Sequence, residues 1–560
     1  QDVGMQSRGD SFVTKGFNSW NKKEKLDLHV GGVNSAHNQA LKNDHNDVIN
    51  EVLQKTPENS KLTHPDIQKD IVNAIAYKTT NAIIEDLGSG FFSILVDESR
   101  DISIKEQMAV VLRYVDKKGI VTERFLGIVH VADTSALSLK TAIEFLLCKY
   151  SLSLSRLRGQ GYDGTNNMQG KFNGLKTLIL KENKSAFYVH CFAHQLQLTL
   201  VVVANKHTDI AEFFSLVSKI VTIVGASCKR REFLRNAQLA KITEALNLGE
   251  LESGQGLNQE TSLKRAGDTR WGSHYMTILN LILMFSSTFD VLEMIEKDSL
   301  LSEQRVEAQS ILRLILSFEF SFALHLMKNI LRSTTELSIA LQKKNQDIVN
   351  AMTLVRVSKQ RLQMMRDDEW EALLTKVSTF CSKHDIPILN MEKIFVVGVR
   401  PRRNAPHITN LHHYRVDLFF KVIDLQLQEL NNRFSEVTTE LLLCMACLNP
   451  SDSFSAFDIQ KLTHFAKFYP SDSSETDVLA LDNQLHTYIV DMCSNNKFLE
   501  LKGIGDLARK MVETNKDVIY PLVYLLVKLV LTLPVATATV ERSFSTMKYI
   551  KNELRNQMGD

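Results

Sequence analysis

Residues 91–131 read FFSILVDESRDISIKEQMAVVLRYVDKKGIVTERFLGIVHV, and this stretch decides the fold class. It contains three apolar segments, at 91–99, 108–116 and 123–131, that have the length and composition of short strands. The turn signal DKKG at 116–119 separates the last two segments. We therefore expect a three-stranded meander at the start of a folded domain.

Helix and strand patterns alternate after the meander. The expected elements are a helix at 135–150, the strand LRGQGYDG at 157–164, a helix at 166–181, the strand AFYVHCF at 186–192, and a helix from 193. Strands that alternate with helices form a sheet covered by those helices. The sequence therefore predicts a mixed sheet-and-helix domain.

A long helical block follows this domain. From about 209 to 510 strand patterns disappear, and the amphipathic helices expected there include 319–343, 346–365, 370–384 and 414–447. A chain of 560 residues is too long for one compact core. The parts we expect are an N-terminal segment at 1–45, a helical segment at 46–90, the mixed domain at 91–206, an all-α block at 207–510 and a C-terminal part at 511–560.

Composition limits the partners and the compartment. The chain has 66 Lys and Arg against 64 Asp and Glu, so any DNA-binding surface must be local. The best candidate for a membrane span, 518–533, is short and contains Lys528, so we expect no span. No secretion signal opens the chain, and seven scattered cysteines suggest free thiols in a reducing compartment, the nucleus or the cytosol.

Two aspartates stand at strand ends. Asp97 ends the first strand of the meander, and Asp163 ends the fourth strand. In an RNase H-like sheet these positions are neighbours, and carboxylates there can hold two divalent metal ions about 4 Å apart. Such a site usually needs a third carboxylate, and both aspartates could also be ordinary turn or cap residues. We leave Glu98 outside the site because strand alternation turns it to the other face, and Asp101 because it falls in the next loop.

Five motifs, in order, resemble the motif series of hAT transposases, particularly the branch related to MYM-type zinc-finger proteins. They are ILVDESRD at 94–101, GQGYDGTNNMQG at 159–170, CFAHQLQL at 191–198, DTRWGSHY at 268–275 and LPVATATVERSFSTMK at 533–548. The resemblance covers roughly residues 60–560. It implies an RNase H-like catalytic core interrupted by a large all-α insertion, action on DNA in the nucleus, and self-association through a C-terminal dimerisation region.

By this resemblance the catalytic triad is Asp97, Asp163 and Glu541, which would hold Mg²⁺ or Mn²⁺. Glu541 lies far beyond Asp163, as expected if the helical block is inserted between the last strand and the last helix of the RNase H-like fold. Without its flanking motif, Glu541 would be a first-turn helix acid that follows a cap at Thr537 or Thr539.

Two further motifs have expected roles. Cys191 and His194 match the Cys-x-x-His motif of the family, and because such a pair is at most half of a zinc site, we expect it to orient the active-site wall. Arg270 and Trp271 match the position where a tryptophan stacks on a base flipped out near the cleavage site. The alternative for Trp271 is a half-buried residue at a helix boundary.

Two basic clusters could neutralise DNA phosphates. Short clusters of this kind are also common at solvated helix ends and loops, which is the alternative for both. Their members are Lys229, Arg230 and Arg231 in the first cluster and Arg400, Arg402 and Arg403 in the second.

The N-terminal stretch FVTKGFNSWNKKEKLDLHVGGVNSAHNQA resembles the tail of a TTF-type zinc finger, with Trp20, His29 and His37 in matching places. The cysteines of such a finger would lie upstream, whereas the first cysteine of this chain is Cys148. Two histidines cannot complete a four-ligand zinc site, so we expect poor zinc binding. We interpret 1–45 as an incomplete finger in a fragment or a degraded element copy.

The leading hypothesis is a transposase, or its descendant, that binds DNA, self-associates and performs two-metal strand cleavage and transfer. The alternative is a domesticated or inactive factor that keeps the fold and binds DNA or protein without turnover. A purely structural helical scaffold would explain the long helices but not the meander or the GYDG turn at 161–164.

Overall fold

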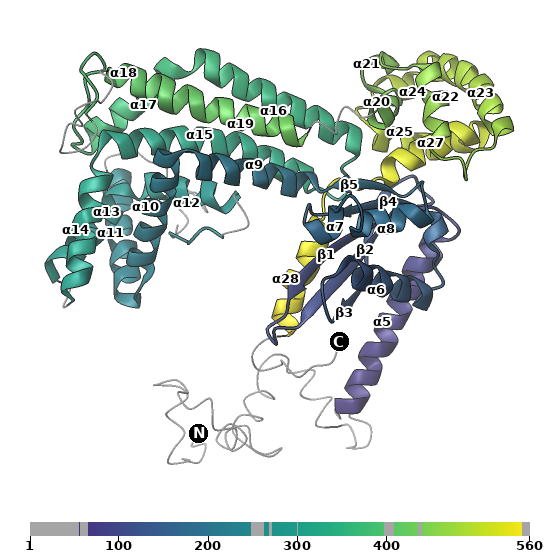
Figure 1. Cartoon of the computed structure of the whole chain (residues 1–560), viewed down its shortest axis with the longest axis horizontal. Helices are drawn as coiled ribbons and strands as arrows, with labels where there is room; N and C mark the ends of the chain where they lie inside the picture. The colour runs from purple at the N-terminus through teal and green to yellow at the C-terminus, as the bar shows by residue number, and fades with distance from the viewer. Residues whose placement is uncertain are drawn as a thin grey trace. The chain divides into compact units, whose positions relative to one another are not determined.

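The computed structural model describes residues 55, 65–247, 263–267, 272–298, 301–396, 408–434 and 440–551. By its contacts the chain divides into two compact units, 1–82 and 83–560, and helix α5 (Pro65–Leu87) runs from the first into the second. The larger unit contains the sheet and the other helices described below (Figure 1). Because it is one unit by its contacts, the domain boundaries expected at 206 and 510 stay predictions.

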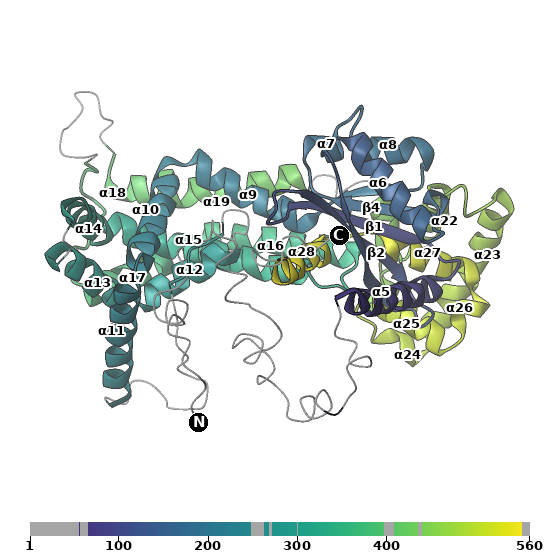
Figure 2. The same cartoon turned by 90° about the horizontal axis from the view of Figure 1, so that it is seen from below.

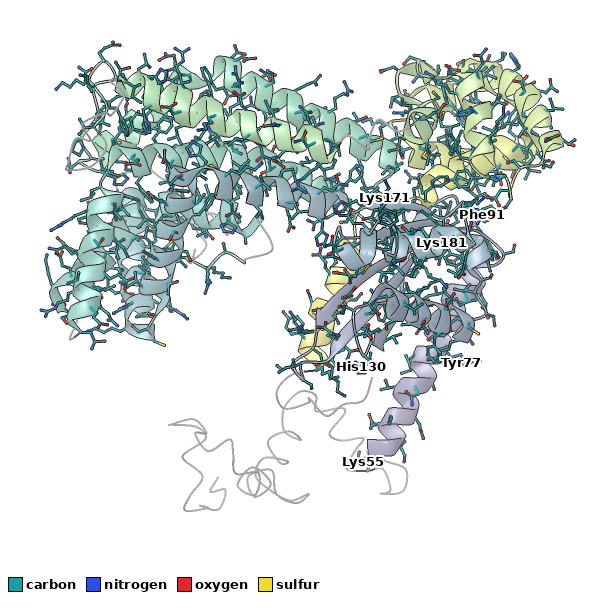
Figure 3. The ribbon with its side chains drawn as sticks, in the orientation of Figure 1. Lys55, Tyr77, Phe91, His130, Lys171 and Lys181 are labelled. Atoms are coloured by element: carbon teal, nitrogen blue, oxygen red, sulfur yellow. The ribbon has the colours of Figure 1, made fainter. Side chains whose placement is uncertain are left out.

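A five-stranded mixed sheet has the order β3-β2-β1-β4-β5. The first three strands, β1 (Phe92–Arg100), β2 (Glu106–Val115) and β3 (Val121–His130), form an antiparallel meander, which confirms the first expectation. β4 (Leu157–Tyr162) pairs parallel with β1, and β5 (Phe187–His190) pairs parallel with β4. Phe91 lies where β1 begins, and His130 lies at the opposite end of the sheet, where β3 ends (Figure 3).

Helical segments follow the third, fourth and fifth strands. They are α6 (Ala136–Lys149), the 3₁₀ turn η2 (Leu154–Arg156), α7 (Asn166–Gln169), α8 (Leu175–Glu182) and α9 (Phe192–Lys206). The single helix expected at 166–181 is therefore wrong, because the chain breaks between α7 and α8. The break contains Gly170 and Gly174, which approach so closely that a Cβ on Gly174 would lie 2.2 Å from the Gly170 nitrogen. Glycine also disfavours a continuous helix.

The two faces of the sheet have different cores. Ile94 and Val96 of β1 belong to a cluster that includes Ile143 of α6 and Ile179 of α8. Residues on the other face, including Leu95, pack against α28 (Ala538–Ile550). Figure 2 shows α6 and α8 on one side of the strands and α28 on the other. The last helix that the structure describes therefore completes the mixed domain that begins some 450 residues earlier, at Phe92.

Close packing at β4 explains its glycines. A Cβ on Gly159 or Gly161 would lie 2.8 or 2.7 Å from the Pro534 ring. Only hydrogen at these positions leaves room for the segment that leads into α28. The GQG sequence of the strand is therefore required by the approach of a distant part of the chain.

Between 207 and 537 the regular secondary structure of the described residues is helical, apart from an isolated bridge between Ile394 and Thr409. With α5 to α9 they make the chain mostly helical, as predicted. The first group is α10 (Thr208–Gly225), α11 (Cys228–Asn247), α12 (Gly272–Leu283), α13 (Phe285–Asp298), α14 (Ser302–Ile315), α15 (Phe318–Leu341), α16 (Ile348–Asp368), α17 (Trp370–Lys383), α18 (Asn410–His412), the π-helix η3 (His413–Phe420) and α19 (Lys421–Arg433). The second group is α20 (Glu440–Ala446), α21 (Ser451–Phe454), α22 (Ile459–Lys467), α23 (Glu475–Ser494), α24 (Asn496–Leu499), α25 (Ile504–Glu513), α26 (Lys516–Ile519) and α27 (Pro521–Thr532).

The single helix expected at 414–447 is also wrong. Its first part is the π-helix and α19, which ends at Arg433, and α20 begins at Glu440. At the end of α19 the side chain of Phe434 is buried against Phe192, with ring centroids 5.3 Å apart. This tertiary contact anchors the chain where the apolar pattern alone predicted a continuing helix.

Among the helices that the structure describes, none is by itself long and apolar enough to span a membrane. Three pairs of consecutive helices reach that length and apolar composition when the two helices of a pair are taken together. The pairs are α10 with α11, α12 with α13 and α14 with α15, and the two helices of each meet at bends of 101°, 80° and 72°, respectively.

Candidate active site

Asp97 lies on the face of the sheet that α28 covers. Successive strand residues alternate between faces, so Asp97 points to the same side as Leu95. Leu95 packs with Val540 and Phe544 of α28. The antiparallel partner of Asp97 on β2 is Ala109, which belongs to the same cluster. The strand pattern and the packing of α28 together place this carboxylate between sheet and helix.

Asp163 follows directly after β4, the strand beside β1. Leu95 and Gly161 are partners in the parallel register, so Asp97 and Asp163 each lie two residues beyond a paired position. Neighbouring strands are about 4.8 Å apart. Thr165 donates two hydrogen bonds to Asp163 Oδ1, from its backbone nitrogen at 3.2 Å and its hydroxyl at 2.8 Å. These bonds hold the carboxylate where the chain leaves the sheet.

Glu541 lies in the first turn of α28. Burial, the largest influence, together with repulsion from the carboxylates of Glu541 and Asp163, raises the pKa of Asp97 to about 6, although His194 opposes the shift. The three acids named by the resemblance therefore come from β1, the end of β4 and α28, and lie close enough to interact electrostatically. The three acids are far apart in the sequence, so no local pattern indicates this proximity.

Glu98 is a fourth carboxylate that the sequence analysis left out. Strand alternation does place it on the opposite face, where Asn167 Nδ2 donates to its Oε1 at 3.2 Å. Burial first, and then repulsion from Asp163 and Asp97, raises its pKa to about 7. Because Asp163 stands at the end of β4, its charge raises the pKa of both Asp97 and Glu98. The alternation of side chains along β1 alone could not predict this shared effect.

Asp101 was also left out, and the structure gives it a separate role. Lys551 Nζ lies 2.8 Å from Asp101 Oδ2, and Gln107 donates to the same oxygen at 3.1 Å. Burial alone would raise the pKa of Asp101, but the hydrogen bonds from Lys551 and the Lys105 backbone outweigh it and hold the pKa well below its usual range. The side chain joins the loop after β1 to the end of α28.

Cys191 follows β5 directly and contacts the segment that enters α28. Cys191 is buried, and its Sγ accepts hydrogen bonds from the Thr537 backbone nitrogen at 3.3 Å and hydroxyl at 3.4 Å. The backbone nitrogen of Phe192 donates to Val535 O at 2.9 Å. These contacts hold the segment that enters α28, and the orienting role of the Cys191 and His194 pair stays a prediction.

His194 supplies positive charge beside the acids. Burial would lower its pKa, but Cys191, Asp97 and Glu541 outweigh burial and raise the pKa to about 10. Its Nδ1 is buried without a hydrogen-bond partner in the described residues. An imidazolium there offsets part of the repulsion among the carboxylates.

The donor chemistry of the three acids suits a hard divalent cation, because carboxylate oxygens are preferred ligands of Mg²⁺ and repulsion among them is relieved by positive charge. Among the residues that the structure describes, no group of three or more His, Cys, Asp or Glu side chains has metal-binding geometry. The ligand set is therefore a proposal about chemistry and not an observed coordination sphere.

Several predicted residues lie outside the described part of the chain. They are the zinc half-site His29 and His37, the stacking pair Arg270 and Trp271, and the second basic cluster Arg400, Arg402 and Arg403. Their roles stay predictions.

The first basic cluster is described, and its members differ. Arg230 is directed inward, with Nη1 donating to Ile223 O at 2.8 Å and Nη2 donating to Gln304 Oε1 at 2.5 Å. These bonds join α11 to α10 and α14, and they favour a packing role for Arg230 over a phosphate contact. Arg231 instead lines a cavity of about 620 Å³ whose rim includes three further cations, Arg235, Lys264 and Arg265. Cations distant in sequence thus meet around one hollow of the helical region.

Comparisons with known proteins agree with this architecture. The family described as "ZMYM1/FAM200, RNase-like domain" matches residues 10–51 and 39–174, and the "hAT family C-terminal dimerisation region" matches 512–560. The protein named "52 kDa repressor of the inhibitor of the protein kinase" from Homo sapiens is 23% identical over 479 residues, which are 84% of this chain and 60% of the relative. Its Mus musculus counterpart is 23% identical over 490 residues, 84% of this chain and 61% of the relative.

An RNase-like sheet completed by a hAT C-terminal helix defines a transposase-like class of protein. In these two regions this chain is similar to hAT transposase-like proteins, and over most of its length it is similar to the two repressors. The chain spans about three fifths of the length of those curated relatives. Its hAT dimerisation region supports self-association.

Proposed function

We propose that this chain is a hAT-type DNA transposase, or derives from one, and that its acidic site cleaves and transfers DNA strands with the help of divalent metal ions. The observation that carries the proposal is the meeting of Asp97, Asp163 and Glu541 from three elements separated in the sequence. An ordinary turn or cap residue has no reason to share a site with two other acids.

Asp97, Asp163 and Glu541 would hold Mg²⁺ or Mn²⁺. The metal ions, when bound, stabilise negative charge on the attacking and leaving oxygens of the phosphodiester. The pairing of β1 with β4 and the packing of α28 on β1 support this ligand set, because they bring the elements that carry the three acids together. His194 offsets part of their charge, and Cys191 fixes the approach to α28 through Thr537.

A nicking assay tests the proposal. The full chain is incubated with DNA that carries the ends of its own encoding element, in Mg²⁺, in Mn²⁺ and in EDTA. We expect nicks at the element ends with either metal and none in EDTA. Binding of those ends without nicking in both metals would overturn the catalytic proposal.

The second candidate is a domesticated factor that binds DNA or protein without turnover. The observation that favours it is the homology to two proteins whose names describe them as repressors. Binding without nicking is the result that this candidate predicts. For both candidates we propose action on DNA in the nucleus, which a fluorescent fusion of the full chain would test. We also propose that zinc is not retained through His29 and His37, which metal analysis of the purified protein would test.

A further inference from the structure

Glu123 of β3 is a buried carboxylate outside the acidic site of Asp97, Asp163 and Glu541. Its side chain is 5% exposed, and both of its oxygens have partners. Oε1 accepts a hydrogen bond from Arg113 Nη1 at 2.8 Å, and Oε2 accepts one from the hydroxyl of Thr539. Thr539 lies in α28, two residues before Glu541. Glu123 therefore holds the turn of helix that carries the third acid.

Arg113 of β2 joins the same carboxylate to the helical region. It stands opposite Glu123 in the strand register and is 1% exposed. Its guanidinium also donates to three backbone carbonyls, to Leu531 and Lys344 at 3.1 Å each and to Gln346. Leu531 lies near the end of α27, and the other two residues lie in the connection between α15 and α16. One buried cation thus joins β2 to three other segments of the chain.

A second contact runs beside the first. Arg542, the residue after Glu541, donates from Nη2 to Gln342 O at the end of α15, at 3.1 Å. Asp347, at the other end of the same connection, caps α16 by accepting from the Asn350 nitrogen at 2.8 Å. The first turn of α28 is therefore tied to this connection on both sides of Glu541.

The hydrogen bonds of Arg113 and Glu123 form a rigid connection. The guanidinium presents its donors in a fixed planar fork, so its bonds cannot shift independently of one another. Leaving a buried charge without its partners is costly, so Arg113 and Glu123 must move together or not at all. A displacement of the α15–α16 connection therefore displaces Arg113, then Glu123, and with it Thr539.

We propose that Arg113, Glu123 and Thr539 form a buried relay that positions Glu541 and makes its position depend on the α15–α16 connection of the helical region. These three are positioning residues, because none belongs to the acidic site. The consequence for metal binding rests on the proposed function, whereas the mechanical coupling to α28 does not.

Three variants of the full chain test the relay. Thr539→Val removes the hydroxyl while keeping the shape, and Thr539→Ser keeps the hydroxyl. Thr546→Val is the matched control, because Thr546 lies in the same helix and its hydroxyl donates to Arg542 O of that helix at 3.0 Å. Only Thr539→Val leaves an oxygen of the buried Glu123 without its donor.

Two readouts are measured on each variant. Hydrogen exchange followed by mass spectrometry reports the opening of the first two turns of α28, and the electron paramagnetic resonance signal of Mn²⁺ reports metal affinity. We expect Thr539→Val to exchange about tenfold faster and to bind Mn²⁺ about tenfold more weakly, since a hydrogen bond to a buried charge is lost. Thr539→Ser and Thr546→Val should match the unmodified protein in both readouts.

A double-mutant cycle tests the link to the helical region. Asp347→Ala removes the side-chain cap of α16, and it should lower Mn²⁺ affinity when Thr539 is intact but add little when Thr539 is valine. Strictly additive effects would overturn the coupling.

The outcomes separate the relay from the proposed function. If Thr539→Val and Thr546→Val show the same exchange in α28, the relay is overturned even if the protein nicks DNA. If the unmodified protein binds no Mn²⁺, the catalytic proposal fails, and the exchange comparison still decides the relay.

Discussion

Asp101 and Lys551 form an ion pair at 2.8 Å in which the side chains are only 1% and 9% exposed. Asp101 follows β1, and Lys551 follows α28, so the pair closes the far end of the last helix onto the first strand. The buried relay holds the start of the same helix. The element that carries Glu541 is therefore fixed by charges at both ends.

Removal of one partner of this pair should destabilise the protein. Asp101→Asn leaves the Lys551 ammonium buried without its counter-charge, a change that typically costs about 3–5 kcal/mol. We expect a lower melting temperature by calorimetry at neutral pH. Asp133→Asn is a suitable control, because Asp133 is an exposed acid that bonds only to nearby serines. Equal melting temperatures for the two variants would contradict a stabilising role for the pair.

The same pair predicts a dependence on acid. The pKa of Asp101 is lower in the folded state than its ordinary value of 3.8, so its stabilising contribution is complete above that value and is lost as pH falls through the folded pKa. As pH is lowered from 5, we expect the melting temperature of the unmodified protein to fall more steeply than that of Asp101→Asn. Parallel curves would show that other acids control unfolding.

The three acids should act as one unit. Asp97→Asn, Asp163→Asn and Glu541→Gln keep size while removing charge, and each should lower metal-dependent nicking by at least about 1000-fold. A double variant should be little worse than a single one, because the metal site is lost in each case. DNA binding, measured by fluorescence anisotropy, should persist in all of them. Full nicking activity in any single variant would remove that residue from the site.

Asp97 also predicts how metal-free stability changes with pH. Its pKa rises from 3.8 to about 6 on folding, so the folded state prefers the protonated form, and this preference is lost as pH rises through 6. In EDTA, Asp97→Asn should therefore melt at a higher temperature than the unmodified protein at pH 8 and at a similar one at pH 4. Added Mg²⁺ should stabilise the unmodified protein at pH 8 and have much less effect on the variant. A variant that melts lower at pH 8 would contradict the burial of this charge.

Substitution of two adjacent arginines of the helical region should affect DNA binding differently. Arg231 lines the hollow with several cations, so Arg231→Ala should weaken DNA binding and reduce the slope of log affinity against log salt by about 0.9. Arg230→Ala should leave that slope unchanged and instead lower the melting temperature, because it loses bonds to Ile223 and Gln304. Identical salt slopes for Arg231→Ala and the unmodified protein would exclude a phosphate contact there.

Local sequence patterns were sufficient for the class of fold. The meander, the strand before Asp163 and the long helices follow from short-range periodicity and turn residues, which depend on few neighbours. Asp163 could be selected because the strand end before it can be located this way. The expectation that Asp97 ends its strand was wrong, because pairing with β2 continues β1 to Arg100. Glu541 could be selected only by resemblance, since an acid in a first helical turn has an ordinary explanation.

Tertiary structure decided how these parts meet. The proximity of Glu98 to Asp163, the pairing of Asp101 with Lys551 and the contact of Thr539 with Glu123 join residues that no local pattern relates. The chain break at Gly170 and the burial of Phe434 likewise reflect close packing that overrides helical periodicity. The sequence determined the elements because their formation is local, whereas the site depends on long-range packing and on the pairing of buried charges.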